Sequence, residues 1–300
     1  MQGMSVEQAI SSGEPILKIG TAGWEEDRRS AFISFYAVMR AADDLVDNSR
    51  KNFASLSSEE KNSIAQFLAS LMNGNLPAGA YVSGLLNKVF ADTAERQKTS
   101  EALDKLNYHL SRFNTYKKKY NIPDHYWKSW LTSMFYDIDH SGFPTFRAFL
   151  SYAYGAAVIP GMIYLHLCGS FDKGGLYLPP PVRLCTYARP IAVFCYVVHI
   201  LRDFNQDITE GLLYFPEKIL LEYNLDIHAL RSYVQEKKNS LKVEKLFQKY
   251  KGIAEYYRIR AEKKTMELKH ILAERYAVSI ETVFRMYEAV LREIGKEPFL

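Results

Sequence analysis

The chain has 300 residues, of which 48% are hydrophobic and 24% are charged, and its formal net charge is +4 at pH 7. These values fit a soluble protein with a sizeable core, and the mild positive charge suits anionic ligands or a membrane surface without indicating nucleic acid. Cys168, Cys185 and Cys195 have no metal-binding spacing, so we interpret them as reduced, buried thiols of an intracellular, cytoplasmic protein. Residues 1–14 lack the pattern of a signal peptide, and we predict a poorly ordered extension there.

Helical signals run through nearly the whole chain. Ser57 and Glu60 form a capping box, and Asn73-Gly74-Asn75 ends the helix that follows it. Ser100 can cap a second helix, and Pro123 opens a third. The apolar residues of these helices are Ile64, Phe67, Leu68, Leu71, Leu103, Leu106, Leu110, Phe113, Trp127, Trp130, Leu131 and Phe135. Alternation typical of strands is nearly absent, which predicts an all-α fold.

The segment 148–171 carries no formal charge and is long enough to span a bilayer. Because it also contains Pro160, His166 and several tyrosines, we interpret it as a buried helix and predict no transmembrane helix. Peripheral contact with a bilayer stays open. After a break at residues 142–144, the clearest loop is 169–181, which holds Gly-Gly and Pro-Pro-Pro.

Two acidic motifs lie on opposite sides of that loop. In each motif aspartates recur at i and i+4, first as Asp43 and Asp47 and then as Asp203 and Asp207, which places each pair one turn apart on a helix. Like charges at this spacing repel, so we expect a cation between them, and two such faces would form an all-oxygen site suited to Mg²⁺. Because a shared site needs both halves in one body, we predict a single all-α domain over residues 15–300.

The first aspartate pair ends a polar stripe on its helix. The stripe consists of Tyr36, Arg40, Asp43 and Asp47. The opposite flank is apolar and contains Phe32, Phe35, Val38 and Leu45. Since residues 31–42 hold a single charge, we predict that most of this helix is buried and that its carboxylates need a metal or a partner. The alternative is a solvated amphipathic helix with an internal Arg–Asp pair.

The second pair ends a similar stripe on a helix that is otherwise apolar. This stripe consists of Tyr196, His199, Asp203 and Asp207, and Arg202 lies beside it. Four carboxylates could hold two or three Mg²⁺ ions on a diphosphate, while the metals, Arg40 and Arg202 stabilise charge as the diphosphate leaves. The allylic cation left behind would need a dry, aromatic-walled cavity. Tyr152, Tyr154 and Tyr164 of the uncharged segment could line it.

Three segments of the chain resemble motifs of the squalene/phytoene synthase family and follow one another in the order that the family has. Residues 36–47 (YAVMRAADDLVD) resemble its first aspartate-rich motif, and residues 199–207 (HILRDFNQD), followed by GLLYFP at 211–216, resemble its second. The segment 152–157 (YAYGAA) is similar to the helix between them. The resemblance covers about residues 28–220.

This resemblance implies an all-α isoprenoid synthase fold, a helical bundle around a central cavity. It also implies Mg²⁺-dependent head-to-head joining of two prenyl diphosphates, farnesyl or geranylgeranyl, through a cyclopropyl intermediate. The residues expected to hold Mg²⁺ are Asp43, Asp47, Asp203 and Asp207. The residues expected to face the diphosphates or the cation are Tyr36, Arg40 and Arg202. The residues expected to contact the substrate are Tyr152, Ala157, Tyr196 and Tyr214.

The chain departs from the family pattern at three positions near the second motif. His199 stands where the family usually has a metal-binding Asn, Tyr196 where it has Gln, and Leu212 where Arg is common. We predict for His199 a phosphate contact or a proton role, because imidazole is a poor ligand for Mg²⁺. These departures keep two alternatives open. One is the same ionisation with a single-substrate outcome, as in a terpene cyclase or a prenyl diphosphate phosphatase; the other is a non-catalytic lipid-binding or assembly protein.

Two further points complete the sequence-based picture. The sequence carries no NADPH signature, so a reductive second step is neither supported nor excluded, and it does not define the prenyl chain length. The basic region 249–269, with Tyr250, Tyr256 and Tyr257, is most simply a solvated helix face, with a membrane-docking surface as the alternative.

Overall fold

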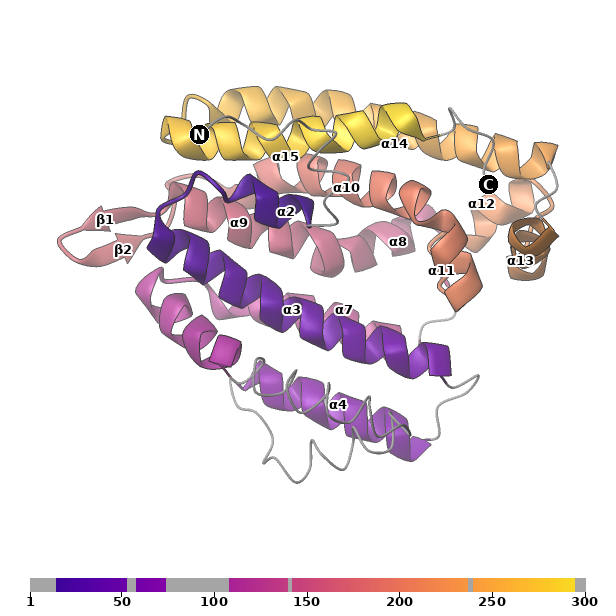
Figure 1. The fold of residues 1–300 in the computed structure, drawn as a ribbon, viewed down its shortest axis with the longest axis horizontal. Helices are drawn as coiled ribbons and strands as arrows, with labels where there is room; N and C mark the ends of the chain where they lie inside the picture. The colour runs from indigo at the N-terminus through magenta and orange to yellow at the C-terminus, as the bar shows by residue number, and fades with distance from the viewer. Residues whose placement is uncertain (1–14, 53–57, 74–107, 140–141, 237–239, 295–300) are drawn as a thin grey trace. The chain divides into compact units, whose positions relative to one another are not determined.

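The computed structural model describes residues 15–52, 58–73, 108–139, 142–236 and 240–294, and these are helical almost throughout (Figure 1). The all-α prediction is therefore confirmed. The chain divides into two compact units. One comprises Glu26–His140 and Ser170–Pro179, and the other comprises Met1–Glu25, Ser141–Gly169 and Pro180–Leu300. The single-domain organisation stays a prediction.

The smaller unit is built from helices that share an aromatic core. Its elements are α3 (Glu26–Asn52), α4 (Ser58–Met72), helical residues 108–119, α7 (Asp124–Asp139), β1 (Phe171–Lys173) and β2 (Leu176–Leu178). Helix α7 packs against α3 and α4 and begins directly after Pro123, as predicted. The rings of Phe35, Phe113 and Trp127 meet with centroids 4.4–5.7 Å apart, and their burial joins α3, residues 108–119 and α7.

Several sequence predictions fall in or beside this unit. The predicted helix end near Asn73 is confirmed, because α4 ends at Met72. The predicted apolar faces of α4 and α7 are buried, apart from Phe135, which is half-buried. The capping Ser57, the Glu60 side chain and residues 100–107 lie outside the described residues.

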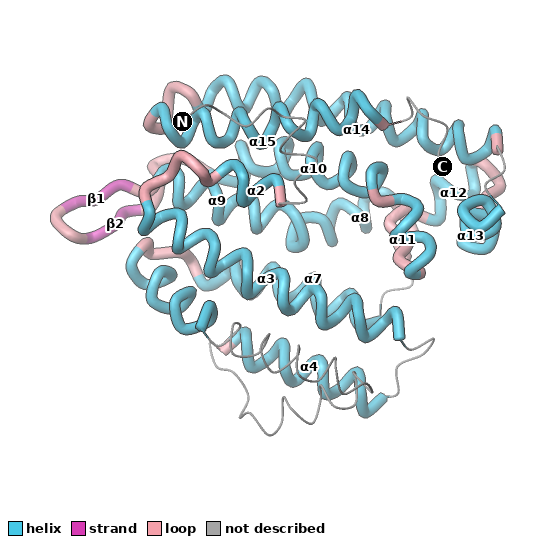
Figure 2. Tube along the Cα trace, viewed as in Figure 1, coloured by secondary structure: helices cyan, strands magenta, loops and turns pink. Residues whose placement is uncertain are grey.

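The predicted loop at 169–181 is wrong in part, because it contains a β-hairpin (Figure 2). Strands β1 and β2 pair antiparallel through Gly174 and Gly175, whose φ angles are +67° and +90°. Two successive positive φ angles suit the tight turns that join strands, and glycine adopts them without strain. The hairpin is held to its unit by the Tyr177 ring, 4.5 Å from that of Tyr120, and by the Arg28 guanidinium, which donates to the Ser170 carbonyl at 2.7 Å.

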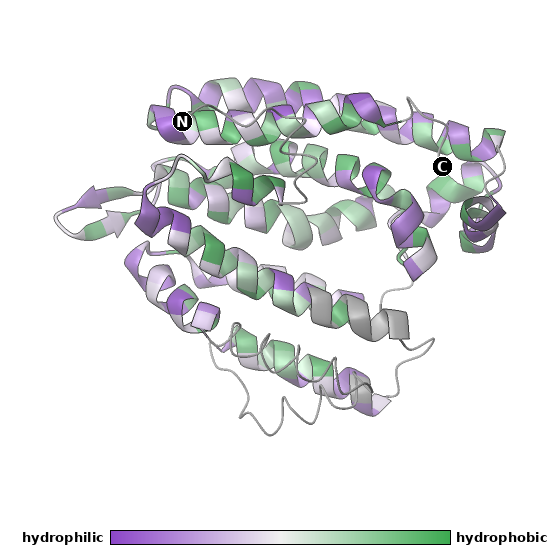
Figure 3. Ribbon diagram, in the orientation of Figure 1, coloured by the Kyte–Doolittle hydropathy of each residue, from purple (hydrophilic) through white to green (hydrophobic). Residues whose placement is uncertain are grey.

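The larger unit is organised around one apolar helix. In chain order its elements are α2 (Ile16–Gly20), α8 (Phe146–Ala153), the π-helix η1 (Tyr154–Val158), α9 (Ile159–Gly169), α10 (Leu184–Arg202), α11 (Phe204–Glu210), α12 (Glu217–Glu222), α13 (Ile227–Glu236), α14 (Leu241–Leu268) and α15 (Glu274–Glu293). Helix α10 packs against α9, η1, α14 and α15, and all nine of its buried residues are apolar. In contrast, the outer helices α14 and α15 alternate polar and apolar residues (Figure 3).

Two helical segments of this unit are long and apolar enough to cross a membrane, Phe146–Gly169 with 24 residues and Leu184–Arg202 with 19. Of their most apolar stretches, 56% and 44% of the residues are buried inside the structure. Core helices pass the same test of length and composition. The predicted helix at 148–171 is thus confirmed up to Gly169, whereas Phe171 already belongs to β1, and the absence of a membrane span stays a prediction.

The cysteines and the basic region differ from expectation in burial. Cys168 is buried as predicted, whereas Cys185 and Cys195 are half-buried. In the basic region 249–269, predicted as a solvated face, Tyr250 has no exposed surface. Its ring packs 4.5 Å from that of Phe215, and the region therefore has a buried side as well as an outer one.

A buried hydroxyl fastens α2 and its following turn to the larger unit. Ser279 of α15 accepts a hydrogen bond from the Trp24 indole at 2.7 Å and donates to the Gly20 carbonyl at 2.5 Å. The Tyr164 hydroxyl of α9 lies 2.5 Å from the Ser279 Oγ. One side chain thus joins three segments in an environment without water, where every unpaired polar group is costly.

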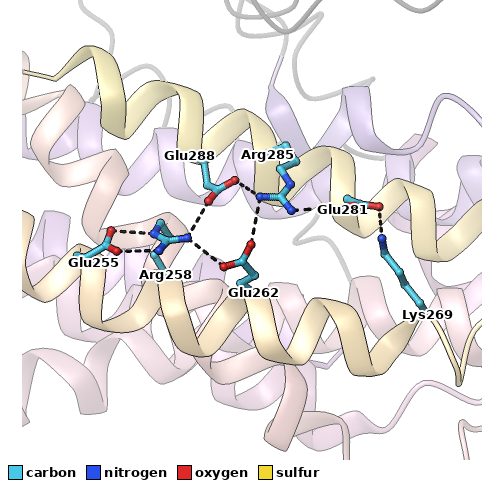
Figure 4. Close-up of polar contacts among 7 residues, drawn as sticks. All are labelled: Glu255, Arg258, Glu262, Lys269, Glu281, Arg285 and Glu288. Atoms are coloured by element: carbon cyan, nitrogen blue, oxygen red, sulfur yellow. Dashed lines mark hydrogen bonds and ion pairs between the residues drawn. The ribbon is translucent and has the colours of Figure 1, made fainter.

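Helices α14 and α15 are also joined by an ion-pair network (Figure 4). Glu288 of α15 is nearly buried and contacts Arg258 at 3.0 Å and Arg285 at 2.6 Å. Both arginines also reach Glu262, at 3.2 and 3.3 Å. Glu255 binds Arg258 at 2.7 Å, so the carboxylates along this seam are neutralised within the unit.

We predict that Ser279→Ala lowers the free energy of unfolding by about 2–4 kcal/mol, because the Trp24 indole and the Tyr164 hydroxyl would lose a shared buried partner. Chemical denaturation measures the difference. Ser151→Ala is the matched control, since that exposed hydroxyl bonds only within its own helix and should change stability by about 0.5 kcal/mol or less. Equal effects of the two changes would contradict the assigned role of Ser279.

We predict that Tyr250→Phe, in contrast, does not lower the free energy of unfolding. The Tyr250 hydroxyl is buried and has no hydrogen-bond partner among the described residues, so the native protein bears the cost of desolvating it. We expect the variant to be as stable as the native protein or more stable by up to about 1 kcal/mol. A loss of stability in the same denaturation experiment would show that the hydroxyl has a partner.

Candidate functional site

The second acidic motif lies at the junction of α10 and α11. The sequence predicted one unbroken helix here, whereas α10 ends at Arg202 and α11 begins at Phe204. Asp203, between them, has φ −95° and ψ 9°, and aspartate is a residue type that favours helix ends. Its amide still bonds the His199 carbonyl, and the Asp207 amide bonds the Asp203 carbonyl, both at 2.9 Å. The i, i+4 relation of the polar stripe therefore survives the break.

The Asp203 carboxylate is held by the side chains that precede it. Arg202 donates to both of its oxygens at 2.7 Å through Nε and Nη2. The Nε2 of His199 lies 2.9 Å from Oδ2 of Asp203, while its Nδ1 lies 2.9 Å from Nη2 of Arg202. Both imidazole nitrogens thus face groups of the protein itself, and His199, Arg202 and Asp203 form one connected polar cluster.

This cluster fixes the charge of Asp203. Partial burial of the carboxyl group opposes its ionisation, but the hydrogen bonds from Arg202 and His199 outweigh that effect. The pKa of Asp203 is therefore held well below its usual range. The pKa of Arg202 is raised by the same hydrogen bond, so the pair stays ionised near neutral pH. Asp207 is half-buried one turn further along.

An aromatic cluster lies along the same stripe, two turns before Asp203. The Tyr196 ring stacks on Phe149 with centroids 5.7 Å apart and planes inclined by 11°. It lies 6.5 Å from the Tyr152 ring and 6.1 Å from that of Tyr214. Three residues predicted to contact the substrate are therefore brought together. Sequence reasoning missed Phe149, whose only signal was its position one helical turn before Tyr152.

The other predicted substrate contact, Ala157, and the other predicted wall residues, Tyr154 and Tyr164, differ in burial. Ala157 is half-buried in the π-helix η1, which packs against α10. Tyr164, proposed as a cavity wall, is instead buried against Trp24 and bonded to Ser279. Tyr154 has 36% of its surface exposed and so is not an inward-facing wall.

Gly211 brings Tyr214 back toward α10. Helix α11 ends at Gly211, whose φ of +83° is a left-handed conformation that glycine adopts readily and other residues rarely do. The Leu212 amide then bonds the Asp207 carbonyl at 2.7 Å, and Leu212 is buried. The reversal thus ties the chain after the motif to its second aspartate.

The first acidic motif belongs to α3 in the other unit. As predicted, Phe32, Phe35 and Val38 are buried. The prediction of a buried polar stripe is wrong for Arg40 and Asp43, whose side chains are 57% and 38% exposed and lie 3.5 Å apart. Spacing alone could not tell how much of each side chain is covered, because one charge in twelve residues also fits a half-buried helix. Tyr36 is half-buried, and the Asp47 side chain lies outside the described part.

Within the part of the chain that the structure describes, no group of three or more His, Cys, Asp or Glu side chains is arranged to hold a metal ion. The donors that remain for a cation at the second motif are the carboxylates of Asp203 and Asp207. Their oxygens are the ligand type that Mg²⁺ prefers, and both oxygens of Asp203 keep lone pairs beyond those that Arg202 uses. The residues therefore fit half of a divalent metal site.

Comparison with known proteins agrees with these motifs. The family described as squalene/phytoene synthase matches residues 21–300. The chain belongs to this family. The predicted relationship is therefore confirmed, and the family consists of prenyltransferases.

A curated relative, the 4,4'-diapophytoene synthase of Staphylococcus haemolyticus, is 26% identical over 160 residues. That match covers 52% of this chain and about half the length of the relative. Two solved structures share the fold at 15% identity and a TM-score of 0.63. The squalene synthase HpnC of Alicyclobacillus acidocaldarius is matched over 98% of this chain and 93% of its own, and a dehydrosqualene synthase bound to a ligand over 94% and 82%.

We predict that Gly211→Ala lowers the free energy of unfolding by about 1–2 kcal/mol, because alanine is strained at this φ and its Cβ would lie 3.1 Å from an Arg231 nitrogen. Gly252→Ala is the matched control. Gly252 lies within α14 with open space around it, so alanine should stabilise the helix by about 0.5–1 kcal/mol. Thermal unfolding of both variants tests the prediction, and a change of the same sign in the two would refute it.

Proposed function

We propose that this protein joins two prenyl diphosphates, farnesyl or geranylgeranyl, head to head into a squalene- or phytoene-type product with the help of Mg²⁺. The observation that carries the proposal is one stripe on α10 and α11 that places Tyr196 and its aromatic neighbours ahead of the anionic pair Asp203 and Asp207. A prenyl diphosphate has the same two ends, an apolar chain and a charged head. Family membership supports the same reaction class.

The charged end of the stripe suits loss of diphosphate. When the C–O bond of the first substrate breaks, both electrons leave with the diphosphate, and charge accumulates on its oxygens. Asp203 and Asp207, together with Asp43 and Asp47 of the first motif, would hold Mg²⁺, which supplies positive charge to the leaving group. Arg202 and Arg40 would add fixed cations. The hydrogen bonds to Asp203 keep that carboxylate ionised and in one orientation before substrate arrives.

The aromatic end suits the carbocation. The faces of Tyr196, Tyr152 and Tyr214 are electron-rich and attract a cation within about 6 Å of the ring centre, while the fully buried Phe149 supports the Tyr196 ring from behind. They also offer apolar surface to the prenyl chain and exclude water, which would otherwise capture the cation. Tyr36 of α3 and Ala157 of η1 are proposed as further substrate contacts. The diphosphate contact predicted for His199 would require its imidazole to leave Asp203 or Arg202, so we propose instead that it holds the Asp203 carboxylate in place.

One observation favours a different fate of the carbocation, in which only one substrate takes part. Tyr196 replaces the Gln usual in the family, and its ring is stacked within the aromatic cluster. An aromatic group there enlarges the surface that stabilises a single cation, which suits intramolecular cyclisation. We therefore keep a one-substrate terpene cyclase or prenyl diphosphate phosphatase as the alternative function.

The test is to incubate the purified protein with Mg²⁺ and farnesyl or geranylgeranyl diphosphate, with and without NADPH, and to analyse the extract. A C30 or C40 hydrocarbon supports the head-to-head reaction, and dependence of its saturation on NADPH would reveal a reductive step. A C15 or C20 alcohol or cyclic hydrocarbon supports the alternative. Absence of turnover with every chain length would refute both.

We predict that Asp203→Ala and Asp43→Ala each lower turnover by about a thousandfold or more, because each removes an anion needed to place the metal charge. Asp172→Ala, at the exposed hairpin, is the matched carboxylate control and should keep full turnover. Calorimetry of Mg²⁺ with inorganic diphosphate gives a readout besides activity and should show weakened binding in the first two variants alone. Retained activity in either of them would overturn the metal assignment.

A further inference from the structure

We propose that the outer face of α14, together with the start of α10, docks onto an anionic lipid bilayer. This docking face consists of the apolar residues Tyr256, Ile259 and Met266 and the cations Arg183, Arg189, Arg260 and Lys263. It includes none of the residues proposed for catalysis. The inference does not depend on the proposed reaction.

The apolar part of the face is a continuous stripe. Tyr256, Ile259, Lys263 and Met266 follow one another at steps of three, four and three residues, which places them on one side of the helix. Tyr256, Ile259 and Met266 are 52%, 58% and 60% exposed. Three large apolar side chains on one outer helix face are a feature of surfaces that enter the lipid headgroup region.

The cations of the face have no carboxylate partners in the described part of the chain. Arg183, Arg189 and Lys263 take part in no ion pair there, and Arg260 lies over the Tyr256 ring at 4.4 Å instead. Three of the four carboxylates of α14 are occupied elsewhere, and the fourth, Glu244, lies twelve residues before Tyr256. Glu255 and Glu262 bind Arg258 in the seam with α15 shown in Figure 4, and Glu267 binds Lys264 at 2.7 Å. The face therefore keeps its positive charge.

Contacts between α14 and α10 make these residues one surface. Lys264 of α14 lies over the Tyr187 ring of α10 at 5.2 Å. Burial raises the pKa of Tyr257, and Arg189 from α10 and Arg260 from α14 are both close enough to oppose that shift. Arg183 and Arg189 likewise both act on Tyr154, whose pKa is also raised by burial. Cations from two helices thus gather around exposed and half-buried tyrosines.

Exposed apolar side chains together with cations that lack carboxylate partners favour a lipid bilayer over a protein as the partner of this face. A protein partner of ordinary composition would require carboxylates opposite all four cations, whereas anionic lipids supply negative charge anywhere along the surface. Long cationic side chains can extend to the phosphates while tyrosine, isoleucine and methionine lie at the acyl boundary. The face is matched to such a layered surface.

The experiment is flotation of the full chain, without substrate, with vesicles of phosphatidylcholine alone or mixed with phosphatidylglycerol. We expect binding to the mixed vesicles alone, weakened by salt. Arg260→Gln with Lys263→Gln should lower the partition coefficient about thirtyfold, since each cation near an anionic bilayer contributes roughly a fivefold factor. Lys128→Gln with Lys218→Gln removes the same charge from exposed positions outside the face and should lower it far less.

The apolar stripe is tested in parallel. Ile259→Ser with Met266→Ser should weaken binding while leaving its salt dependence, and Leu221→Ser with Leu241→Ser is the matched control at exposed leucines. Equal loss in a test pair and its control, or no loss in the test pairs, would overturn the proposal, as would binding to neutral vesicles alone. A change in sedimentation of the Ile259/Met266 variant would assign the face to self-association instead. Activity assays are separate, so failure of the proposed reaction would leave this result standing.

Discussion

The burial of α10 determines which way the polar stripe points. The helix is enclosed by α9, η1, α14 and α15, and its nine buried residues are all apolar. Burying a single Val, Leu, Ile or Phe contributes about 1.5–3 kcal/mol, whereas one partly exposed hydrogen bond or ion pair contributes about 1 kcal/mol. A rotation of α10 that improved the contacts of His199 or Asp203 would therefore cost far more than it gained. Packing sets the direction of the stripe, and its polar contacts adjust within that limit.

Polar interactions then act at the end of this helix. The Asp203 carboxylate could cap α11, but it makes no such bond and turns to Arg202 and His199 instead. That choice leaves the first turn of α11 without a side-chain cap and gives a carboxylate whose charge and orientation are fixed by its neighbours. Ser279 and the α14–α15 seam are similar, since in each a few polar groups join separate segments of the chain. The seam has a second effect, because it occupies Glu255 and Glu262 of α14 and leaves the cations of the outer face without these partners.

The sequence was sufficient where one physical rule decided the outcome. Apolar spacing located α4, α7 and α10, and aspartates at i and i+4 located both motifs, because helical period fixes which residues share a face. The sequence was insufficient where contacts with other parts of the fold determine the local structure. The hairpin at Gly174 and Gly175 depends on pairing between two strands of three residues, too short to show alternation. The break at Asp203 depends on where its carboxylate finds partners. Burial of Arg40 and Asp43 depends on what covers α3, which a single stripe cannot tell, and Phe149 entered the aromatic cluster through contacts across the fold.

Because of the π-helix η1, the number of residues in the segment from α8 to α9 affects the structure of this protein. Its hydrogen bonds span one residue more than those of an α-helix, so the helical faces before and after it are offset by about 100° from an unbroken helix. Tyr152 and Phe149 lie before the offset, and the buried side of α9 lies after it. A one-residue deletion within Tyr154–Val158 would let the segment become a regular helix and would turn these two faces relative to each other. Substitutions reshape the aromatic cluster one side chain at a time, whereas an insertion or deletion here would turn Phe149 and Tyr152 together in a single evolutionary step.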